Sequence, residues 1–413
     1  MQIRDPKVGI NVRLADPAIW ADPYPVYARM RQAAPLVRGR MPPLGDAWLA
    51  TRYEDVSTIL KDPKLFRSDA RHTTGKSGPL DGRFTPKILR NFARSMVFVD
   101  GLDHRRLRGL VTKAFTPAQV TQLSARIEAI TVELLDQAQR QGTFDLMSGF
   151  ALPLPLRIIS DLLGVEKEEE DYFHHTANCI LELNSAWNFI KRLPRLIGLQ
   201  RFFERLLERK RANPGDDLTS ALIAAEEQGD RLSSDELMGM VFLLLFAGHE
   251  TTVNLLGNGT LTLLENPEQL ERLRADPALI PTAIEEMLRY QSPAQTTGPR
   301  YVSEPTELGG MPLEHGERVI PLIAAANRDE HVFDDPDTFD VGRQPNRHLA
   351  FGFGPHFCVG AHLSRVEARI AFRVFIERFP HLRLATARDQ VRWNKSTSLR
   401  GLQALPLTLA RAA

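Results

Sequence analysis

Hydrophobic residues recur along most of this chain at spacings of three and four residues, which is the spacing of amphipathic helices. The pattern predicts helices over 117–141, 156–163, 168–184 and 190–211, separated by glycine, proline or polar breaks. Apolar stretches between turn signals near 36–52 and 300–325 predict a small amount of sheet. We therefore expect a mainly α fold with a minor β region.

The longest apolar run follows Ser233-Ser234-Asp235-Glu236 and continues to Asn266-Pro267. The S-x-x-E spacing is that of a capping box, which predicts a helix start. Such a helix would be about 45 to 50 Å long and, being apolar nearly all round, would be buried. Its middle, 247–252, reads Ala-Gly-His-Glu-Thr-Thr. A buried carboxylate and two hydroxyls cost free energy unless they are bonded or used, so this is either a tolerated kink or a functional site.

A second unusual stretch is the loop 348–361, which contains three glycines, a proline and Cys358. Such a backbone turns sharply and lets something flat or bulky approach closely. Apolar spacing predicts a helix over 361–379, and the positive end of its dipole would favour the thiolate form of Cys358. The alternative is that Cys358 is a small buried hydrophobic residue, which is the common role of a free cysteine.

Composition narrows the classes of protein. The 52 basic and 51 acidic side chains leave a formal charge of +1, so nothing calls for nucleic acid or an anionic membrane surface. Cys179 and Cys358 are far apart and form no CxxC motif, which favours a reducing compartment over a disulfide framework. The N-terminus lacks the apolar segment of a signal peptide, and the run 241–248 is too short to span a bilayer. We therefore expect a cytoplasmic protein, with Cys179 in the core or lining a pocket.

The motif Phe351-x-x-Gly354-x-His356-x-Cys358-x-Gly360 resembles the haem-binding loop of the cytochrome P-450 superfamily, the haem-thiolate monooxygenases. The resemblance extends over essentially the whole chain. It implies a single catalytic domain over 1–413, with haem b between the long central helix and the cysteine loop and its helix. Cys358 would be the axial iron ligand, and the haem would also contact the loop residues Phe351, Gly352 and Gly360.

The centre of the long helix matches the (Ala/Gly)-Gly-x-(Asp/Glu)-Thr signature of the same family. By resemblance, Thr251 belongs to the oxygen and water network and Glu250 to proton delivery, which dioxygen reduction requires. Ala247 would leave space over the haem. We expect His249 to pack within the helix bundle and not to bind iron.

Four residues are expected to contact the haem propionates. His104 and Arg108 are four apart and so share a helix face, although a basic helix start by itself is usually a solvated surface. The family resemblance assigns this pair to one propionate. It also assigns Arg300 and His356 to propionate contacts.

Glu286-x-x-Arg289 resembles the ExxR signature of the family. Pairs at this spacing are common on helix surfaces and alone mean little. In the family they join an arginine from a later irregular segment, here Arg343, in a buried ion network behind the haem. Such a network would fix the Cys358 loop and would take no part in the chemistry.

The substrate pocket is expected to be mostly apolar. Steps of four back from Thr251 along the central helix reach Ala247 and Leu243, and Phe246 adjoins that stripe. The family resemblance adds three residues to this pocket. They are Phe98 from the irregular segment 66–98, Leu181 from a lid and Leu399 from a C-terminal loop. Thr296 and Thr297 are further candidates, but 293–300 is one residue longer than the common family spacing, which leaves their register open.

The resemblance implies a monooxygenase that inserts one atom of O2 into a lipophilic small molecule by hydroxylation or epoxidation. Electrons would come from a separate ferredoxin or flavodoxin with an NAD(P)H-dependent reductase, and we expect a monomer. Two alternatives remain open: a haem-thiolate peroxygenase driven by hydrogen peroxide, and a haem sensor or carrier without turnover.

Overall fold

The computed structural model describes residues 12–41, 45–75, 85–115, 117–177, 186–227 and 232–410. Contacts divide the chain into two compact units, each built from separate sequence segments. The first unit comprises Met1–Gly75, Thr131–Ala151 and Thr251–Ala413, and the second comprises Lys76–Ile130 and Leu152–Glu250. The single catalytic domain over 1–413 stays a prediction.

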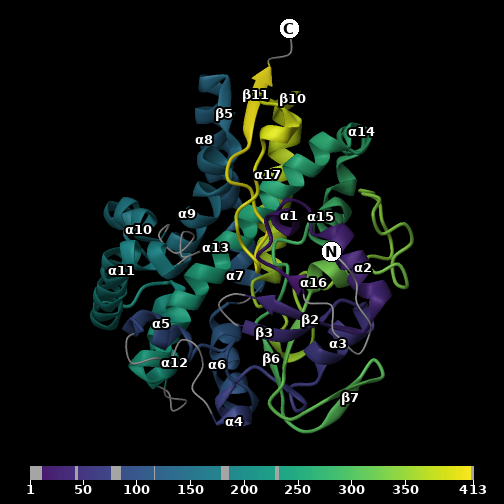
Figure 1. Cartoon of the computed structure of the whole chain (residues 1–413). Helices are drawn as coiled ribbons and strands as arrows, with labels where there is room; N and C mark the ends of the chain where they lie inside the picture. Colours follow the sequence, from purple (N-terminus) through teal and green to yellow (C-terminus); the bar gives the residue numbers. More distant parts are fainter. Residues whose placement is uncertain are drawn as a thin grey trace. The chain divides into compact units, whose positions relative to one another are not determined.

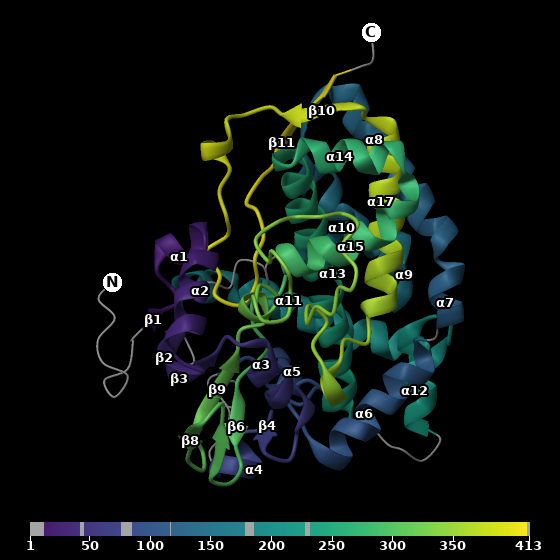
Figure 2. The same cartoon turned by 90° about the vertical axis from the view of Figure 1, so that its right-hand side faces the viewer.

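The first unit contains a six-stranded sheet in the order β1-β2-β3-β9-β6-β4. Its strands are β1 (Val12–Arg13), β2 (Leu36–Met41), β3 (Gly45–Ala50), β4 (Phe66–Arg67), β6 (Arg300–Val302) and β9 (Arg318–Pro321). β3 pairs with β9 in parallel, with Leu49 opposite Ile320, and both side chains are fully buried. Figure 2 shows β2 and β3 in purple beside β6 and β9 in green, although these pairs are far apart in the sequence.

Two smaller sheets and several helices complete the first unit (Figure 1). The small sheets are β10 (His381–Leu384), β11 (Pro406–Ala410) and β5 (Thr143–Asp145), and the hairpin β7 (Thr306–Leu308) with β8 (Met311–Leu313). The helices are α1 (Pro17–Ala21), α2 (Tyr24–Ala33), α3 (Tyr53–Lys61), α4 (Arg71–Thr74), α14 (Pro267–Ala275), α15 (Ile280–Tyr290), α16 (Ile323–Ala326) and α17 (Ala361–Arg378), with a π-helical turn at Met147–Ala151.

The second unit is helical in the part of it that the structure describes. Its helices are α5 (Lys87–Phe92), α6 (Gly101–Ala114), α7 (Pro117–Gln122), α9 (Pro153–Leu163), α10 (Glu170–Ala177), α11 (Ala186–Ala212) and α12 (Leu218–Glu227). Two helices contribute residues to both units, namely α8 (Ser124–Gln141) and α13 (Ser234–Glu265).

Helix α13 confirms the prediction of a long buried helix. Its 32 residues correspond to about 48 Å. The capping box forms in both directions, because the Ser233 N–H donates to Glu236 Oε2 at 2.7 Å and the Glu236 N–H donates to Ser233 Oγ at 3.2 Å. By length and composition this helix could cross a membrane. However, 67% of its most apolar 18-residue stretch is buried inside the protein, as in the core helix of a globular protein.

Several element predictions were wrong in detail. The segment 66–98 is not one irregular loop, since it contains β4, α4 and α5. The predicted helix over 117–141 is interrupted at Leu123. The sheet predicted near 300–325 ends at Pro321, and the residues 323–326 form α16, because three successive alanines favour helix over strand. Cys179 and Leu181 lie outside the described residues.

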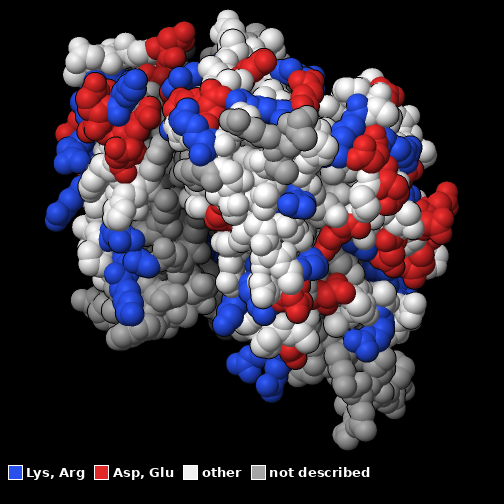
Figure 3. Space-filling model, turned by 90° about the horizontal axis from the view of Figure 1, so that it is seen from above, with Lys and Arg blue, Asp and Glu red and all other residues white. Residues whose placement is uncertain are grey.

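Both signs of charge are interspersed on the surface. Figure 3 shows Lys and Arg mixed with Asp and Glu over the described part of the face that it draws. This agrees with the near-zero formal charge of the whole chain.

Candidate functional site

The Cys358 loop lies in the first unit and runs directly into α17. The Cys358 N–H donates to the Phe351 carbonyl at 2.8 Å, and the Cys358 carbonyl accepts from the Ala361 N–H at 3.4 Å. Cys358 is exposed, so it is not the buried hydrophobic residue of the alternative reading. Its sulfur stands beside the first turn of α17, where the helix dipole favours an anionic thiolate.

Glycines keep this loop thin and close to its support. Gly352 and Gly354 have φ values of 72° and 69°, a region that strongly favours glycine. A Cβ on Gly354 would lie 2.5 Å from the Leu60 carbonyl oxygen at the end of α3, so this position admits no side chain. The neighbouring rings of Phe353 and Phe357 are 43% and 39% exposed. An exposed thiol among exposed rings is a surface that a flat apolar group can cover.

The predicted ion network behind the loop forms around Glu286 on α15. Arg289 Nε lies 2.7 Å from Glu286 Oε2, and Arg343 Nε lies 3.1 Å from Glu286 Oε1. The side chains of Glu286 and Arg289 are completely buried. Asn346 Nδ2 and the Asp340 N–H also donate to the carboxylate of Glu286, at 3.1 and 3.0 Å. The carboxylate therefore has four donors, two of them cationic, and ties α15 to the segment before the cysteine loop.

A second carboxylate network, centred on Glu285, was not predicted from the sequence. Arg365 on α17 donates to both oxygens of Glu285 at 2.7 Å, and His348 Nε2 lies 3.0 Å from Oε2. Burial raises the pKa of Glu285, but the hydrogen bonds from Arg365 and His348 outweigh it and hold this pKa at about 2. The Arg365 guanidinium also lies 4.4 Å from the centre of the Phe351 ring. This network links α15, the loop and α17, and its partners are too distant in sequence to give a local motif.

The predicted propionate residues occupy both units. Arg300 begins β6 with 5% of its side chain exposed, and its Nη1 donates to the Gly298 carbonyl at 3.3 Å. His356 Nε2 is 3.3 Å from Ser68 Oγ. In the second unit, His104 and Arg108 lie on α6, with His104 buried and Arg108 partly exposed.

The middle of α13 departs from the burial of the rest of the helix. Ala247 is exposed, and Glu250 and Thr251 are partly exposed. Apolar surroundings raise the pKa of Glu250 to about 7, so this carboxyl exchanges protons near neutral pH. His249 is fully buried, and burial lowers its pKa to about 4 while its Nδ1 lies 2.6 Å from the Leu245 carbonyl. His249 therefore packs as a neutral side chain, as expected.

Glu367 on α17 is a buried carboxyl that the sequence analysis missed. It is 1% exposed, and its described hydrogen-bond partner is the Thr252 hydroxyl. Within the described residues, its Oε2 has no hydrogen-bond partner. Burial raises its pKa to about 8. The signal available in the sequence was a carboxylate on the apolar face formed by Leu363, Val366 and Ile370.

Two substrate-pocket candidates of the second unit, Phe98 and Phe246, contact Phe92, which the sequence analysis had not singled out. The rings of Phe98, Phe242 and Phe246 lie 5.1, 5.2 and 5.7 Å from the Phe92 ring, all in edge-to-face contact. Leu243, which follows Phe242 on α13, is also buried. Phe98 and Phe246 are thus parts of one aromatic cluster.

The candidates of the first unit lie on two paired segments. Leu399 forms a β-bridge with Ala294, and Thr296 is buried while Thr297 is partly exposed. The side chain of Gln295 binds α2, since its Oε1 accepts a hydrogen bond from the Tyr27 hydroxyl at 2.6 Å. This hydrogen bond directs the Gln295 side chain to Tyr27, and the pocket positions of Thr296 and Thr297 stay a prediction.

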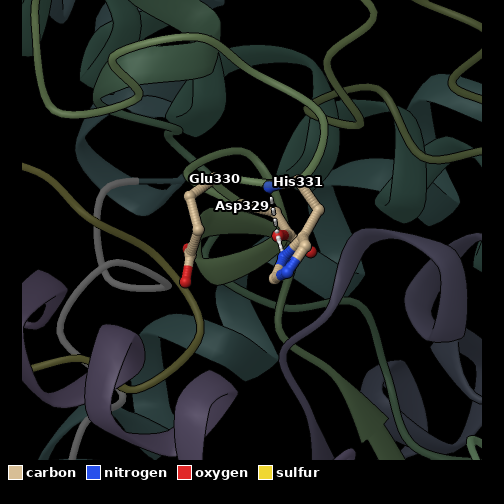
Figure 4. Close-up of side chains that lie close together, drawn as sticks. All are labelled: Asp329, Glu330 and His331. Carbon is tan, nitrogen blue, oxygen red and sulfur yellow. Dashed lines mark hydrogen bonds and ion pairs between the residues drawn. The ribbon is translucent and has the colours of Figure 1, made fainter.

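Asp329, Glu330 and His331 bring three potential metal-binding atoms within 4.8 Å of one another (Figure 4). The structure explains them without a metal. Asp329 Oδ2 accepts from the Tyr53 N–H at the start of α3 at 2.7 Å, and Oδ1 accepts from His331 Nδ1 at 3.0 Å. Glu330 pairs with Arg31. The cluster caps a helix and joins two segments of the first unit.

Comparisons with known proteins place this geometry in a family. The family model described as cytochrome P-450 matches residues 43–400. Cytochrome P-450 107B1 of Saccharopolyspora erythraea is 45% identical over 393 residues, covering 95% of this chain and 96% of that protein. Vitamin D(3) 25-hydroxylase of Pseudonocardia autotrophica is 41% identical over 392 residues, covering 94% of each. The solved structure of the bacillaene polyketide synthase cytochrome P-450 PksS of Bacillus subtilis 168 has a TM-score of 0.88 at 38% identity, and the match covers 96% of this chain and 99% of that one.

The chain belongs to the cytochrome P-450 family and has its fold. It is a haem-iron monooxygenase that uses O2. The residues described above fit such a cofactor, because an exposed thiol at a helix start suits iron and buried Arg300 offers a cationic donor to a carboxylate.

Proposed function

We propose that Cys358 is the axial ligand of haem b in this enzyme. The observation that carries the proposal is the exposed Cys358 thiol, held by a backbone hydrogen bond on a loop that the Glu285 and Glu286 networks support. When bound, a thiolate-ligated haem supplies the activation of O2 that lets one oxygen atom enter a C–H or C=C bond. The chain supplies the ligand, the orientation of the cofactor and the protons. The contacts of Phe351, Gly352, Gly360 and Ala247 with the haem belong to this proposal.

The same proposal assigns the polar residues. His104, Arg108, Arg300 and His356 donate hydrogen bonds to the propionates, since each carries N–H groups suited to a carboxylate. Thr251 positions water and oxygen with its hydroxyl. Glu250 transfers protons from solvent, which its pKa of about 7 and its partial exposure support.

The substrate we propose is a lipophilic small molecule held by the aromatic cluster around Phe92 and by Leu243, Thr296, Thr297 and Leu399. The names of two relatives, a vitamin D(3) hydroxylase and a polyketide-synthase cytochrome P-450, support this class. We further propose a monomeric cytoplasmic protein that receives electrons from a ferredoxin or flavodoxin and an NAD(P)H-dependent reductase. Product formed with this system, compared with product formed with hydrogen peroxide alone, distinguishes a monooxygenase from a peroxygenase.

The ligand assignment is tested with Cys358→Ala. The reduced carbon monoxide complex of the wild-type protein should show the red-shifted Soret band of thiolate ligation, and the variant should lack it. Cys179→Ala is the matched control and should retain the band. A red-shifted band in Cys358→Ala would exclude Cys358 as the ligand.

A further inference from the structure

A cavity of about 540 Å³ lies within the first unit, away from the cysteine loop in sequence. Its walls come from the end of α1, the start of α2, the end of α15 and the C-terminal segment 388–400, which Figure 2 shows passing beside α1 and α2. The volume is in the range of small-molecule sites. None of the residues discussed for the haem or the substrate lines it.

Arg400 is a buried cation of this cavity, and the carboxylate of Asp22 in the same walls acts on it electrostatically without a salt bridge to it in the described structure. Only 4% of the residue is exposed, and its guanidinium lies 3.6 Å from the centre of the Trp393 ring. Its hydrogen bonds go to neutral oxygens, which are Gln291 Oε1 at 2.8 Å and the Trp20 and Ala21 carbonyls at 3.1 and 3.3 Å. Among the salt bridges of the described residues, none involves Arg400. Burial accordingly lowers the pKa of Arg400.

Arg328, in the same cavity, shows the contrasting arrangement. Its guanidinium lies 3.8 Å from the Tyr24 ring centre and 3.7 Å from the Tyr290 ring centre. Its charge is balanced, because Nη1 donates to Asp337 Oδ1 at 2.7 Å. Arg388, at the rim, pairs with Glu265. Of the three arginines that line the cavity, Arg400 is the one whose described hydrogen bonds go to neutral oxygens and to no carboxylate.

The donors that remain on Arg400 suit one anion. A guanidinium carries five N–H groups, and the three bonds above leave two of them. Gln291 is fixed in orientation, since its Oε1 also accepts from the Tyr24 hydroxyl at 3.1 Å. Its amide nitrogen is therefore a further donor beside Arg400. The two remaining N–H groups and this amide are three donors, a number that one carboxylate can accept, whereas the acidic Asp22 and Asp337 in the walls disfavour a polyanion.

We propose that this cavity binds a small planar organic monocarboxylate. The carboxylate accepts from the two remaining N–H groups of Arg400 and from the amide of Gln291. The flat body of the ligand lies against the aromatic walls of Tyr24, Tyr290 and Trp393, which arginine stacking holds in place.

The test uses benzoate and benzamide, which share a ring and differ in charge. The full-length holoenzyme is labelled with fluorotryptophan, and the Trp393 fluorine resonance is identified among the four tryptophans by its loss in Trp393→Phe. Benzoate should shift this resonance with a Kd of about 1 mM or tighter, and benzamide should bind at least about tenfold more weakly. Reading the signal at Trp393 separates this cavity from any binding near the haem.

The decisive variant is Gln291→Glu, which keeps the shape of the side chain and places a carboxylate 2.8 Å from Arg400. It should weaken benzoate binding at least about tenfold, because the carboxylate of the variant would occupy the Arg400 guanidinium in place of the ligand. Arg388→Gln, at the exposed rim, should change the affinity by less than about threefold. Equal binding of benzoate and benzamide, or unchanged benzoate binding in Gln291→Glu, would overturn the proposal, as would no Trp393 shift at about 10 mM benzoate.

Discussion

Glu286 and Glu367, two buried carboxyl groups in the described part of the first unit, have opposite surroundings. Glu286 has four donors, including the guanidinium groups of Arg289 and Arg343. Glu367 has one described partner, the Thr252 hydroxyl, and burial raises its pKa to about 8. A buried charge is stable only when it is fully partnered, and otherwise the group becomes neutral.

Fully hydrogen-bonded carboxylates support the structure, whereas sparsely hydrogen-bonded carboxyl groups can exchange protons. Around the cysteine loop, every described carboxylate oxygen of Glu285 and Glu286 accepts at least one hydrogen bond, which fixes three segments against one another. At the middle of α13 and on the facing part of α17, the carboxyl groups of Glu250 and Glu367 are sparsely partnered and have pKa values near or just above neutrality. The loop region is held rigidly, whereas these two carboxyl groups can change protonation state.

Glu286→Ala tests whether the fully hydrogen-bonded carboxylate stabilises the fold, and we expect it to have the largest effect of the three variants. It leaves Arg289, which is completely buried, without its carboxylate, and we expect a loss of about 3–5 kcal/mol in the free energy of unfolding. Urea unfolding, followed by circular dichroism and by haem release, measures it. Glu271→Ala is the matched control, since Glu271 pairs with Arg274 at the same i,i+3 spacing but is 66% exposed, and it should cost at most about 1 kcal/mol. Equal losses in the two variants would contradict the comparison.

Glu250→Gln tests whether a sparsely hydrogen-bonded carboxyl group transfers protons during the reaction. Loss of a proton-transfer group should lower the rate of product formation about a hundredfold. Because the pKa of Glu250 is raised to about 7, its protonated fraction falls as the pH rises through 7, and the wild-type rate should titrate there while the variant's rate does not. Initial rates between pH 6 and pH 8.5 measure both effects. Glu265→Gln, at the end of the same helix, should keep the wild-type profile.

Glu367→Gln should have the smallest effect at neutral pH and a distinct pH signature. The folded protein holds the Glu367 proton up to about pH 8, whereas the ordinary pKa is 4.5, so the folded state binds more protons than the unfolded state between these values. The stability that this proton contributes is complete below about pH 4.5 and is lost as the pH rises through 8, by at most about 1.4 kcal/mol per pH unit. The variant should lack this slope. An unchanged slope in unfolding curves from pH 5 to pH 8.5 would refute the assignment.

Patterns within short stretches of the sequence predicted the helices and residue pairs that depend on neighbouring residues. The apolar run and the capping box predicted α13 to within two residues, and the i,i+3 spacing predicted the Glu286–Arg289 pair. Arg343 was predicted through the family resemblance and joins Glu286 in the structure.

Contacts between distant segments were beyond the reach of these patterns. Glu285 meets Arg365 across 80 residues, and Glu367 faces Thr252 from another helix, so neither pair has a spacing that a sequence displays. The haem, proton-transfer and substrate roles of individual residues stay predictions until they are tested.

The anchoring of Gln295 bears on our proposal that its neighbours Thr296 and Thr297 contact the substrate. Its side chain is bonded to Tyr27, its N–H donates to the Ser398 carbonyl at 2.8 Å, and its carbonyl accepts from the Ala324 N–H at 3.1 Å. Three separate parts of the chain therefore hold the backbone at this position. Combinatorial libraries at Thr296 and Thr297 would vary side chains on a backbone that stays in place, whereas a library at Gln295 would mix changes of selectivity with losses of folding. Under this proposal, Thr296 and Thr297 are the positions to vary, and Gln295 is the position to keep.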